Sequence, residues 1–250
     1  MKAYLFKFLN NSIFNAILIQ FKLDRVLLKL HHGWRDLEYD QDRSIESNMG
    51  FSMPEVQSKY LPEIKSDLKY FVQNQLEKES QILDLGCGAG FYLREFEGVY
   101  GLNGLDINPS FIKEAKRRIP SATFFTTDFL SFETDQRFNL IYSISVIEYV
   151  PPSALRSFFQ KLWQLTEDEG FIYIQYPHAI KQGDLKYPDL SYNRYSPNHI
   201  EMTASEFFDV QRHKHSFEEK SVENFDANPI RADLENFFGN GYTYIGKRCK

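Results

Sequence analysis

A short glycine-rich stretch offers the clearest chemistry in this sequence. Gly86, Gly88 and Gly90 stand at alternate positions directly after an apolar run, 82–85, that contains one acid, Asp84. The run predicts a buried parallel strand and the glycines predict a turn. Glycine has no Cβ and tolerates positive φ, so such a turn lets a ligand approach bare backbone. A dinucleotide-binding turn has glycines at its first, third and sixth positions, whereas these stand at the first, third and fifth, which argues against a dinucleotide.

Two acids stand at the ends of the next predicted strands. Residues 99–106 predict a second strand that ends in Asp106, and residues 122–128 predict a third strand that ends in Asp128. Asp106 falls 20 positions after Gly86, about where a carboxylate accepts hydrogen bonds from both hydroxyls of a ribose. We therefore expect a nucleoside site at the carboxyl ends of these strands.

The spacing of Asp84 and the three glycines, with Asp106 and Asp128 behind them, resembles the signature of the class I S-adenosylmethionine-dependent methyltransferases, in their small-molecule branch. The resemblance covers roughly residues 62–250 and implies the cofactor S-adenosyl-L-methionine, with S-adenosyl-L-homocysteine as the product. In that family the turn cradles the amino-acid end of the cofactor, and the two later acids bind its ribose and its adenine. The residues expected to bind the cofactor are Asp84, Gly86, Cys87, Gly88, Gly90, Asp106, Ile107, Asp128, Phe129, Ser143 and Ile144.

The same resemblance implies the fold class. We expect an α/β protein with a doubly wound, mostly parallel seven-stranded sheet, a Rossmann-like methyltransferase fold, with a helical N-terminal extension. Residues 1–61 would form this extension or lid, and 62–250 the methyltransferase domain with an acceptor-side insertion at 177–202. The spacing at 203–206 is that of a capping box and predicts the start of the last large helix. The other expected elements are helices at 62–76, 91–96, 109–119, 155–165 and 231–238, and strands at 138–152 (with its loop), 170–177, 218–225 and 241–246.

Methyl transfer to a hydroxyl needs a group that removes a proton, and two histidines are the catalytic candidates. His178 follows the fifth predicted strand and His199 precedes the last predicted helix. A neutral imidazole titrates near working pH, so either histidine could accept the proton. We expect the tyrosine-rich insertion to roof the acceptor cavity beside them. Tyr149 stands where the small-molecule branch usually has a histidine, so no role of that histidine carries over.

The residues after the fourth predicted strand exclude other branches of the family. The sequence lacks the Asn/Asp-Pro-Pro-Tyr/Phe motif with which amino-directed DNA methyltransferases grip a flipped base, and the Pro-Cys nucleophile of cytosine-C5 enzymes. Ser143 stands where metal-dependent catechol-type enzymes place a ligand aspartate, so no metal site is expected. The net charge of −5 also argues against a nucleic-acid partner.

The first 30 residues differ from the rest in charge and composition. They carry five basic residues and one acid, in a chain whose net charge is −5, and they are rich in apolar side chains. Their longest unbroken apolar run, 16–19, is far shorter than the roughly 20 residues of a membrane span. We expect them to pack over the cofactor side as a lid or against a second subunit of a homodimer. The alternative, an interfacial helix on an anionic membrane, is the second choice.

Two cysteines, Cys87 and Cys249, give no disulfide framework and favour a reducing, cytoplasmic location. The sequence as a whole predicts an S-adenosylmethionine-dependent methyltransferase. Its acceptor would be an oxygen or nitrogen of a small molecule, such as a sugar, a lipid-linked compound or a secondary metabolite. The alternatives are a catalytically silent binding subunit with the same fold and, less favoured by the glycine spacing, a nicotinamide-dependent oxidoreductase.

Overall fold

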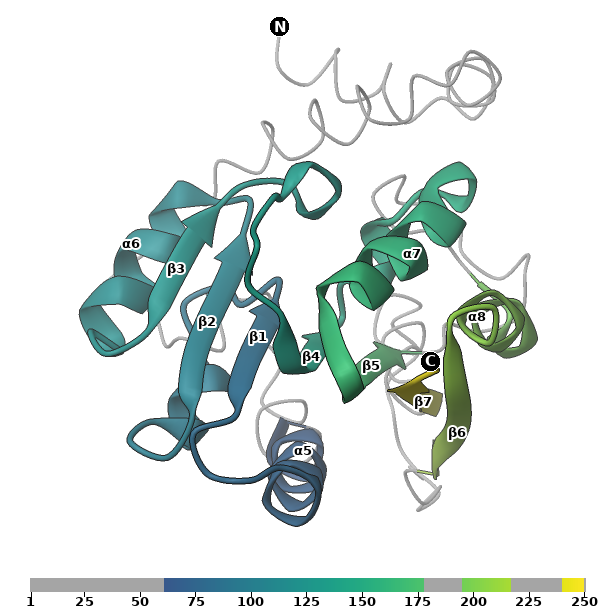
Figure 1. Cartoon of the computed structure of the whole chain (residues 1–250), viewed down its shortest axis with the longest axis horizontal. Coiled ribbons are helices and arrows are strands. Elements are labelled where there is room, and N and C mark those ends of the chain that lie inside the picture. The colour runs from purple at the N-terminus through teal and green to yellow at the C-terminus, as the bar shows by residue number, and fades with distance from the viewer. Residues whose placement is uncertain (1–60, 178–194, 217–239, 250) are drawn as a thin grey trace, which may run out of the picture.

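A seven-stranded sheet organises the protein (Figure 1). The computed structural model describes residues 61–177, 195–216 and 240–249. The strands are β1 (Gln81–Leu85), β2 (Gly101–Asp106), β3 (Thr123–Thr126), β4 (Phe138–Ile144), β5 (Thr166–Pro177), β6 (Phe208–Ser216) and β7 (Asn240–Arg248). Their order is β3-β2-β1-β4-β5-β7-β6; the neighbours from β3 to β5 run parallel, and β7 runs antiparallel to both β5 and β6. The predicted fold class, a mostly parallel seven-stranded sheet with helices, is confirmed.

Four α-helices and four short 3-10 turns are described alongside these strands. The α-helices are α5 (Leu61–Gln75), α6 (Pro109–Arg118), α7 (Leu155–Leu165) and α8 (Pro197–Ala204). The 3-10 turns are η2 (Leu93–Phe96), η3 (Phe129–Ser131), η4 (Ile147–Tyr149) and η5 (Pro152–Ala154).

Local sequence sets where two of the helices begin. The Asn108 side chain accepts a hydrogen bond from the Ser110 N–H at 2.9 Å and so caps α6, as its sequence predicts. The Ser196 hydroxyl accepts from the His199 N–H at 3.2 Å and caps α8 in the same way. A proline follows each cap, where its missing N–H costs nothing.

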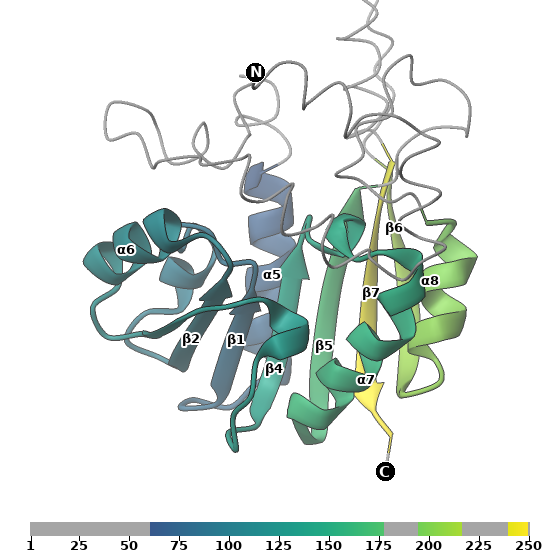
Figure 2. The same cartoon turned by 90° about the horizontal axis from the view of Figure 1, so that it is seen from above.

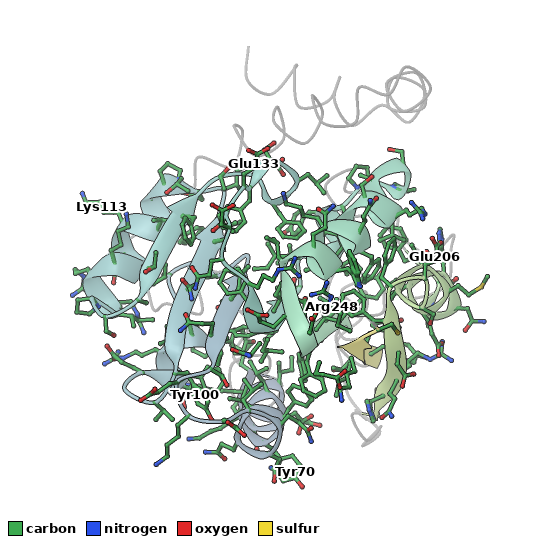
Figure 3. All side chains as sticks on the ribbon, in the orientation of Figure 1. Tyr70, Tyr100, Lys113, Glu133, Glu206 and Arg248 are labelled. Carbon is green, nitrogen blue, oxygen red and sulfur yellow. The ribbon has the colours of Figure 1, made fainter. Side chains whose placement is uncertain are left out.

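Helices cover both faces of the sheet (Figure 2). α5 and α6 pack on one face, here called the α5 face, and α7 and α8 pack on the other, the α7 face. Because side chains alternate along a strand, Ile82 of β1 enters the α5 face while Leu83 and Leu85 enter the α7 face. Tyr70 projects from α5 away from the sheet, whereas Arg248 of β7 lies among the strands and helices (Figure 3).

The C-terminal part of the sheet corrects the expected order of elements. The capping-box spacing at 203–206 predicts a helix through Phe208, but α8 begins earlier, at the Ser196 cap, and ends at Ala204. The residues that follow form β6, whose ladder with β7 starts by pairing Phe208 with Arg248. Hydrogen bonding along the whole ladder with β7 outweighs a local capping signal, so the residues from Phe208 onward form a strand rather than a helix.

The segment after the glycine turn also differs from its prediction. The expected helix at 91–96 is the single 3-10 turn η2, in which the Glu95 N–H donates to the Tyr92 carbonyl oxygen. Gly98, at φ +78°, turns the chain away too soon for an α-helix to follow.

Several expectations lie outside the described residues. They are the structure of the extension at 1–60, the environment of His178, most of the 177–202 insertion, the strand at 218–225 and the helix at 231–238. Within the described ranges, no helix combines the length and the apolar character that crossing a bilayer requires.

Candidate active site at the carboxyl ends of β1, β2 and β4

The glycine turn takes the backbone conformation that its sequence predicts. Gly86, Gly88 and Gly90 have φ values of +77°, +51° and +76°, which side chains rarely adopt. The Gly86 N–H donates to the carbonyl oxygen of Leu105, in β2, at 2.7 Å, and this bond ties the turn to the neighbouring strand. A Cβ on Gly86 would lie 2.3 Å from Cγ2 of Val146, so the turn fits closely under the residues after β4.

Cys87, the residue between the first two glycines, contributes through its backbone. Its N–H also donates to the Leu105 carbonyl oxygen, at 3.0 Å. Its side chain is buried, and burial raises the pKa of the thiol well above its usual value. A thiol held protonated in this way is no nucleophile.

Asp106, at the end of β2, is bonded to the turn. Its Oδ2 accepts from the Gly88 N–H at 2.9 Å, and its Oδ1 accepts from the Asn108 N–H at 2.8 Å. Burial raises the pKa of this carboxyl group, while the backbone N–H groups of Asn108, Gly88 and Ile107 oppose that shift. Each carboxylate oxygen can accept more than one hydrogen bond, so Asp106 can still accept hydrogen bonds from two ribose hydroxyls.

Asp128 and Phe129 lie after β3, at the start of η3. The end of β3 is fixed to β2 by the Thr127 N–H, which donates to the Asp106 carbonyl oxygen at 3.1 Å. Asp128 Oδ2 accepts from the Ser131 hydroxyl at 3.1 Å, and the Phe129 ring packs edge-on against Phe158 of α7. The residue before Asp128 is therefore hydrogen-bonded to the end of β2, so Asp128 follows directly after the last link between β3 and β2.

The end of β4 lies next to β1 and meets the turn. Ser143 and Ile144 are the last two residues of β4, and both are buried. The Ser143 hydroxyl has no hydrogen-bond partner among the described residues. Ser145 then takes a left-handed conformation, φ +55°, held by its N–H donating to the Gln175 carbonyl oxygen at 3.1 Å. This bend brings Val146 over Gly86.

Asp84 is a buried acid two residues before the turn. It is 3% exposed, and its Oδ2 accepts from the Tyr142 hydroxyl at 2.8 Å. Burial raises the pKa of Asp84 to about 8; the Tyr142 hydrogen bond opposes the shift, and the charge of Asp106 adds to it. Burial therefore favours the protonated form of Asp84, and a cation beside it would favour the charged form.

Three buried polar residues, Tyr92, Tyr142 and Glu148, were not among the site residues predicted from the sequence. Tyr92 and Tyr142 lie on the α5 face with Asp84, and their apolar neighbours in the sequence gave no sign of a polar role. Glu148, in η4, is 2% exposed, and burial raises its pKa to about 8. An acid set among Ile147, Tyr149 and Val150 was the available signal for Glu148, because buried carboxyl groups cluster at functional sites.

The structure describes one of the two candidate histidines. His178 lies outside the described residues. His199 is an exposed residue of α8, and its ring contacts Tyr195 edge-on at 5.7 Å between centroids. Tyr195 is itself buried: its hydroxyl donates to the Val150 carbonyl oxygen, and its N–H donates to the Tyr176 hydroxyl oxygen at 3.0 Å. The loop after β4 and the start of α8 are thus fastened together, and the catalytic role of either histidine stays a prediction.

No metal centre emerges from the ranges that the structure describes, where no three histidine, cysteine or acidic side chains are grouped as ligands.

Comparison with known proteins agrees with this geometry. Residues 82–170 match the family described as a methyltransferase domain. The chain is 28% identical, over 113 residues, to the trans-aconitate 2-methyltransferase of Rhizobium rhizogenes, covering 44% of this chain and 43% of that one. It is 29% identical, over 80 residues, to the dTDP-3-amino-3,4,6-trideoxy-alpha-D-glucopyranose N,N-dimethyltransferase of Streptomyces venezuelae, covering 32% and 34%. The matched part spans less than half the length of these relatives.

Among solved structures, the fold is similar to that of the N-methyltransferase NodS from Bradyrhizobium japonicum in complex with S-adenosyl-L-homocysteine. The TM-score is 0.64 at 14% identity, with 86% of this chain and 98% of that chain covered. A methyltransferase from Archaeoglobus fulgidus gives a TM-score of 0.58 at 19% identity, covering 78% and 97%. Residues 82–170 therefore match a methyltransferase domain, and the order of the seven strands agrees with the fold of these solved methyltransferase structures.

Proposed function

We propose that this protein transfers a methyl group from S-adenosyl-L-methionine to an oxygen or nitrogen of a small-molecule acceptor. The observation that carries the proposal is the hydrogen bond between the Gly88 N–H and Asp106 Oδ2, which joins the glycine turn to the acid at the end of β2. It unites in one place a backbone cradle for the amino-acid end of the cofactor and a carboxylate for its ribose.

The residues present fit this cofactor. The three left-handed glycines form a tight turn at the end of β1, and two buried hydroxyls, those of Tyr92 and Ser143, have no partner among the described residues. We infer that Asp84, Gly86, Cys87, Gly88 and Gly90 hold the amino-acid end. Asp106 and Ile107 would hold the ribose, Asp128 and Phe129 the adenine, and Ser143 and Ile144 the methionine portion. The cofactor supplies the reactive methyl group, and the protein aligns the acceptor with it.

The acceptor is proposed from chemistry and from the relatives. The curated relatives methylate trans-aconitate and an amino sugar nucleotide, both small molecules. We propose an acceptor of this size class, with His178 or His199 as the proton acceptor and the 177–202 insertion as the roof of its site. The cysteine usage supports a cytoplasmic location.

Cofactor titration tests the proposal. Calorimetry on the full chain should show binding of S-adenosyl-L-homocysteine, and Asp106→Ala should weaken it by about 1–3 kcal/mol, because the ribose hydroxyls and the Gly88 N–H lose a charged acceptor. Asp209→Ala, at an exposed aspartate on β6, is the matched control and should bind as the parent does. Equal affinities of the parent and Asp106→Ala would refute the ribose role.

A screen of small acceptors with methyl-labelled cofactor then tests turnover. Transfer of label to an oxygen or nitrogen acceptor is the expected result. Cofactor binding without turnover of any acceptor would instead indicate a catalytically silent binding subunit. Binding of NAD, and not of S-adenosyl-L-homocysteine, would indicate an oxidoreductase.

A further inference from the structure

The loop after β4, residues 145–150, crosses the start of the glycine turn. Its first residue, Ser145, has a φ of +55°, a conformation that residues other than glycine rarely adopt. The Ser145 N–H donates to the Gln175 carbonyl oxygen at 3.1 Å, and the Ser145 hydroxyl lies 3.5 Å from Gln175 Oε1. Gln175 is 3% exposed, so this link to β5 is buried. A residue keeps such a conformation where its surroundings impose it, and these residues cluster at functional sites.

Val146, the next residue of the loop, lies against Gly86. Gly86 has a φ of +77°, and a Cβ built on it would lie 2.3 Å from Cγ2 of Val146. The methyl group of Val146 therefore fills the space that a side chain on Gly86 would need. Valine is branched at Cβ, so its χ1 angle is restricted and this methyl group has little freedom to move away. On its other side, Gly86 donates its N–H to the Leu105 carbonyl oxygen of β2, so it is held from two directions.

The far end of the loop is fixed as well. The Tyr149 N–H donates to the Val146 carbonyl oxygen at 2.9 Å, which closes the turn η4. The Val150 carbonyl oxygen then accepts a hydrogen bond from the buried Tyr195 hydroxyl, just before α8. Val146 thus stands between an attachment to β5 and an attachment to the start of α8, and both keep its side chain over the glycine turn.

We propose that Val146 is a positioning residue for the glycine turn and acts through Gly86. By filling the space beside Gly86, it keeps the turn in the left-handed conformation in which the cofactor binds. Glycine loses more conformational freedom on ordering than any other residue, so a turn that is ordered in advance spares the cofactor that cost. The inference rests on the proposed function and adds to it a residue of the loop after β4.

Two valines of the same loop separate this role from packing alone. Val146→Ala removes the methyl group beside Gly86, so the ligand must order the turn. Calorimetry on the full chain should show binding of S-adenosyl-L-homocysteine weakened about three- to tenfold. Val150→Ala is the matched control, because the Val150 side chain is 8% exposed and belongs to the core of the α7 face. It should lower the midpoint of urea unfolding, while its affinity stays within about twofold of the parent.

A double substitution gives the sharper test. Gly86→Ala should weaken binding of S-adenosyl-L-homocysteine at least about tenfold, because the new Cβ strains the positive φ and overlaps the Val146 methyl group. Val146→Ala leaves only the Cβ of that residue, which would lie 3.5 Å from the new Cβ, an ordinary van der Waals contact. The double variant should therefore bind about threefold more tightly than Gly86→Ala, although each substitution alone weakens binding.

Gly90→Ala is the matched control for this rescue. Gly90 belongs to the same turn and has nearly the same φ, +76°, but a Cβ built on it would meet Cδ1 of Ile119 at 2.8 Å. Val146→Ala does not relieve that overlap, so it should not rescue Gly90→Ala, and the two losses should add.

Equal affinities of Val146→Ala and Val150→Ala, or a double variant that binds no better than Gly86→Ala, would overturn the inference while the proposed function stands. Equal rescue of Gly90→Ala would do the same, because the effect would then be a general loosening of the fold. If the glycine variants do not fold, the comparison of the two valine variants still decides. A parent protein that does not bind S-adenosyl-L-homocysteine would overturn the proposed function and the inference together.

Discussion

The two faces of the sheet use the same residue type to different ends. On the α7 face, the buried hydroxyls of Tyr195 and Tyr244 each donate to a backbone carbonyl oxygen, and Tyr176 accepts from a backbone N–H. On the α5 face, Tyr142 donates to a carboxylate and Tyr92 has no partner among the described residues. Tyrosines that are similarly buried therefore differ in their hydrogen bonding: on the α7 face their hydroxyls bond to the backbone, and on the α5 face one bonds to a carboxyl group and one has no partner among the described residues.

The difference helps to separate tyrosines that stabilise the fold from tyrosines that belong to a binding site. A tyrosine that closes a hydrogen bond to the backbone fastens segments of the fold, as Tyr195 fastens the start of α8 to the loop after β4. A buried tyrosine hydroxyl that has no partner among the described residues, such as that of Tyr92, lowers the stability of the fold. Stability measurements on single hydroxyl deletions can therefore tell the faces apart without any ligand.

The largest expected effect on stability comes from ionising the buried Asp84 carboxyl group on the α5 face. The pKa of Asp84 is raised to about 8 in the fold, against about 3.9 in an unfolded chain, so the protonated acid favours folding. Its contribution is fully present below pH 4 and is lost as pH rises through 8. Asp84 by itself should lower the free energy of unfolding of the cofactor-free protein by about 2 kcal/mol between pH 6 and pH 8, measured by urea denaturation as the difference between the parent and Asp84→Asn.

Glu148 provides the internal control for this titration. Its pKa is also raised to about 8, so it contributes with the same sign and over the same range. Asp84→Asn and Glu148→Gln should each remove part of the slope, and the double variant most of it. If Asp84→Asn left the pH dependence of the free energy of unfolding unchanged, the Asp84 carboxyl group would be solvated in the cofactor-free protein. The two faces of the sheet would then not differ in the way described.

A smaller effect is expected from deleting a hydroxyl on the α7 face. Tyr195→Phe leaves the buried Val150 carbonyl oxygen without its donor and should lower the free energy of unfolding by about 1–2 kcal/mol. Tyr70→Phe, on a side chain that is 71% exposed, is the control and should change nothing measurable. Thermal unfolding followed by circular dichroism gives the comparison, and indistinguishable midpoints would mean that the Tyr195 fastening carries no energy.

The smallest effect, with the opposite sign, is expected on the α5 face. Tyr92→Phe removes a buried hydroxyl that has no partner among the described residues, so the empty protein should be unchanged or more stable by up to about 1 kcal/mol. Urea denaturation beside Tyr195→Phe measures the contrast directly. A loss as large as that of Tyr195→Phe would mean that the Tyr92 hydroxyl is satisfied in solution.

Local signals predicted the glycine turn and its strands. The run at 82–85, the alternate glycines and the acid at Asp106 lie within one strand-turn-strand unit, where backbone conformation depends on neighbours in the sequence. Asp84 and Asp106 were found because acids stand out in apolar runs. Tyr92 and Tyr142 were not found, because only the folded ladder of β1 and β4 shows what surrounds their hydroxyls.

Long-range pairing explains where the prediction was wrong. Phe208 belongs to β6 because β7 pairs with it from far along the chain, and no local pattern carries that information. The capping signal at 203–206 predicted a helix start at the position where α8 ends, because the N-cap of that helix is Ser196. Strand pairings between distant segments are the part of a fold that a single sequence specifies least directly.

The position of β7 has a consequence for the order of folding. β7 follows β6 in the chain, yet it lies between β5 and β6 in the sheet. During synthesis β6 leaves the ribosome before its neighbour exists, so its edge waits unpaired until β7 emerges and inserts. Charged and polar side chains at Asp209, Gln211 and Arg212 suit such a wait, because they disfavour pairing with another chain. The parallel strands that carry the glycine turn can assemble earlier, and the sheet closes last at the end farthest from the cofactor.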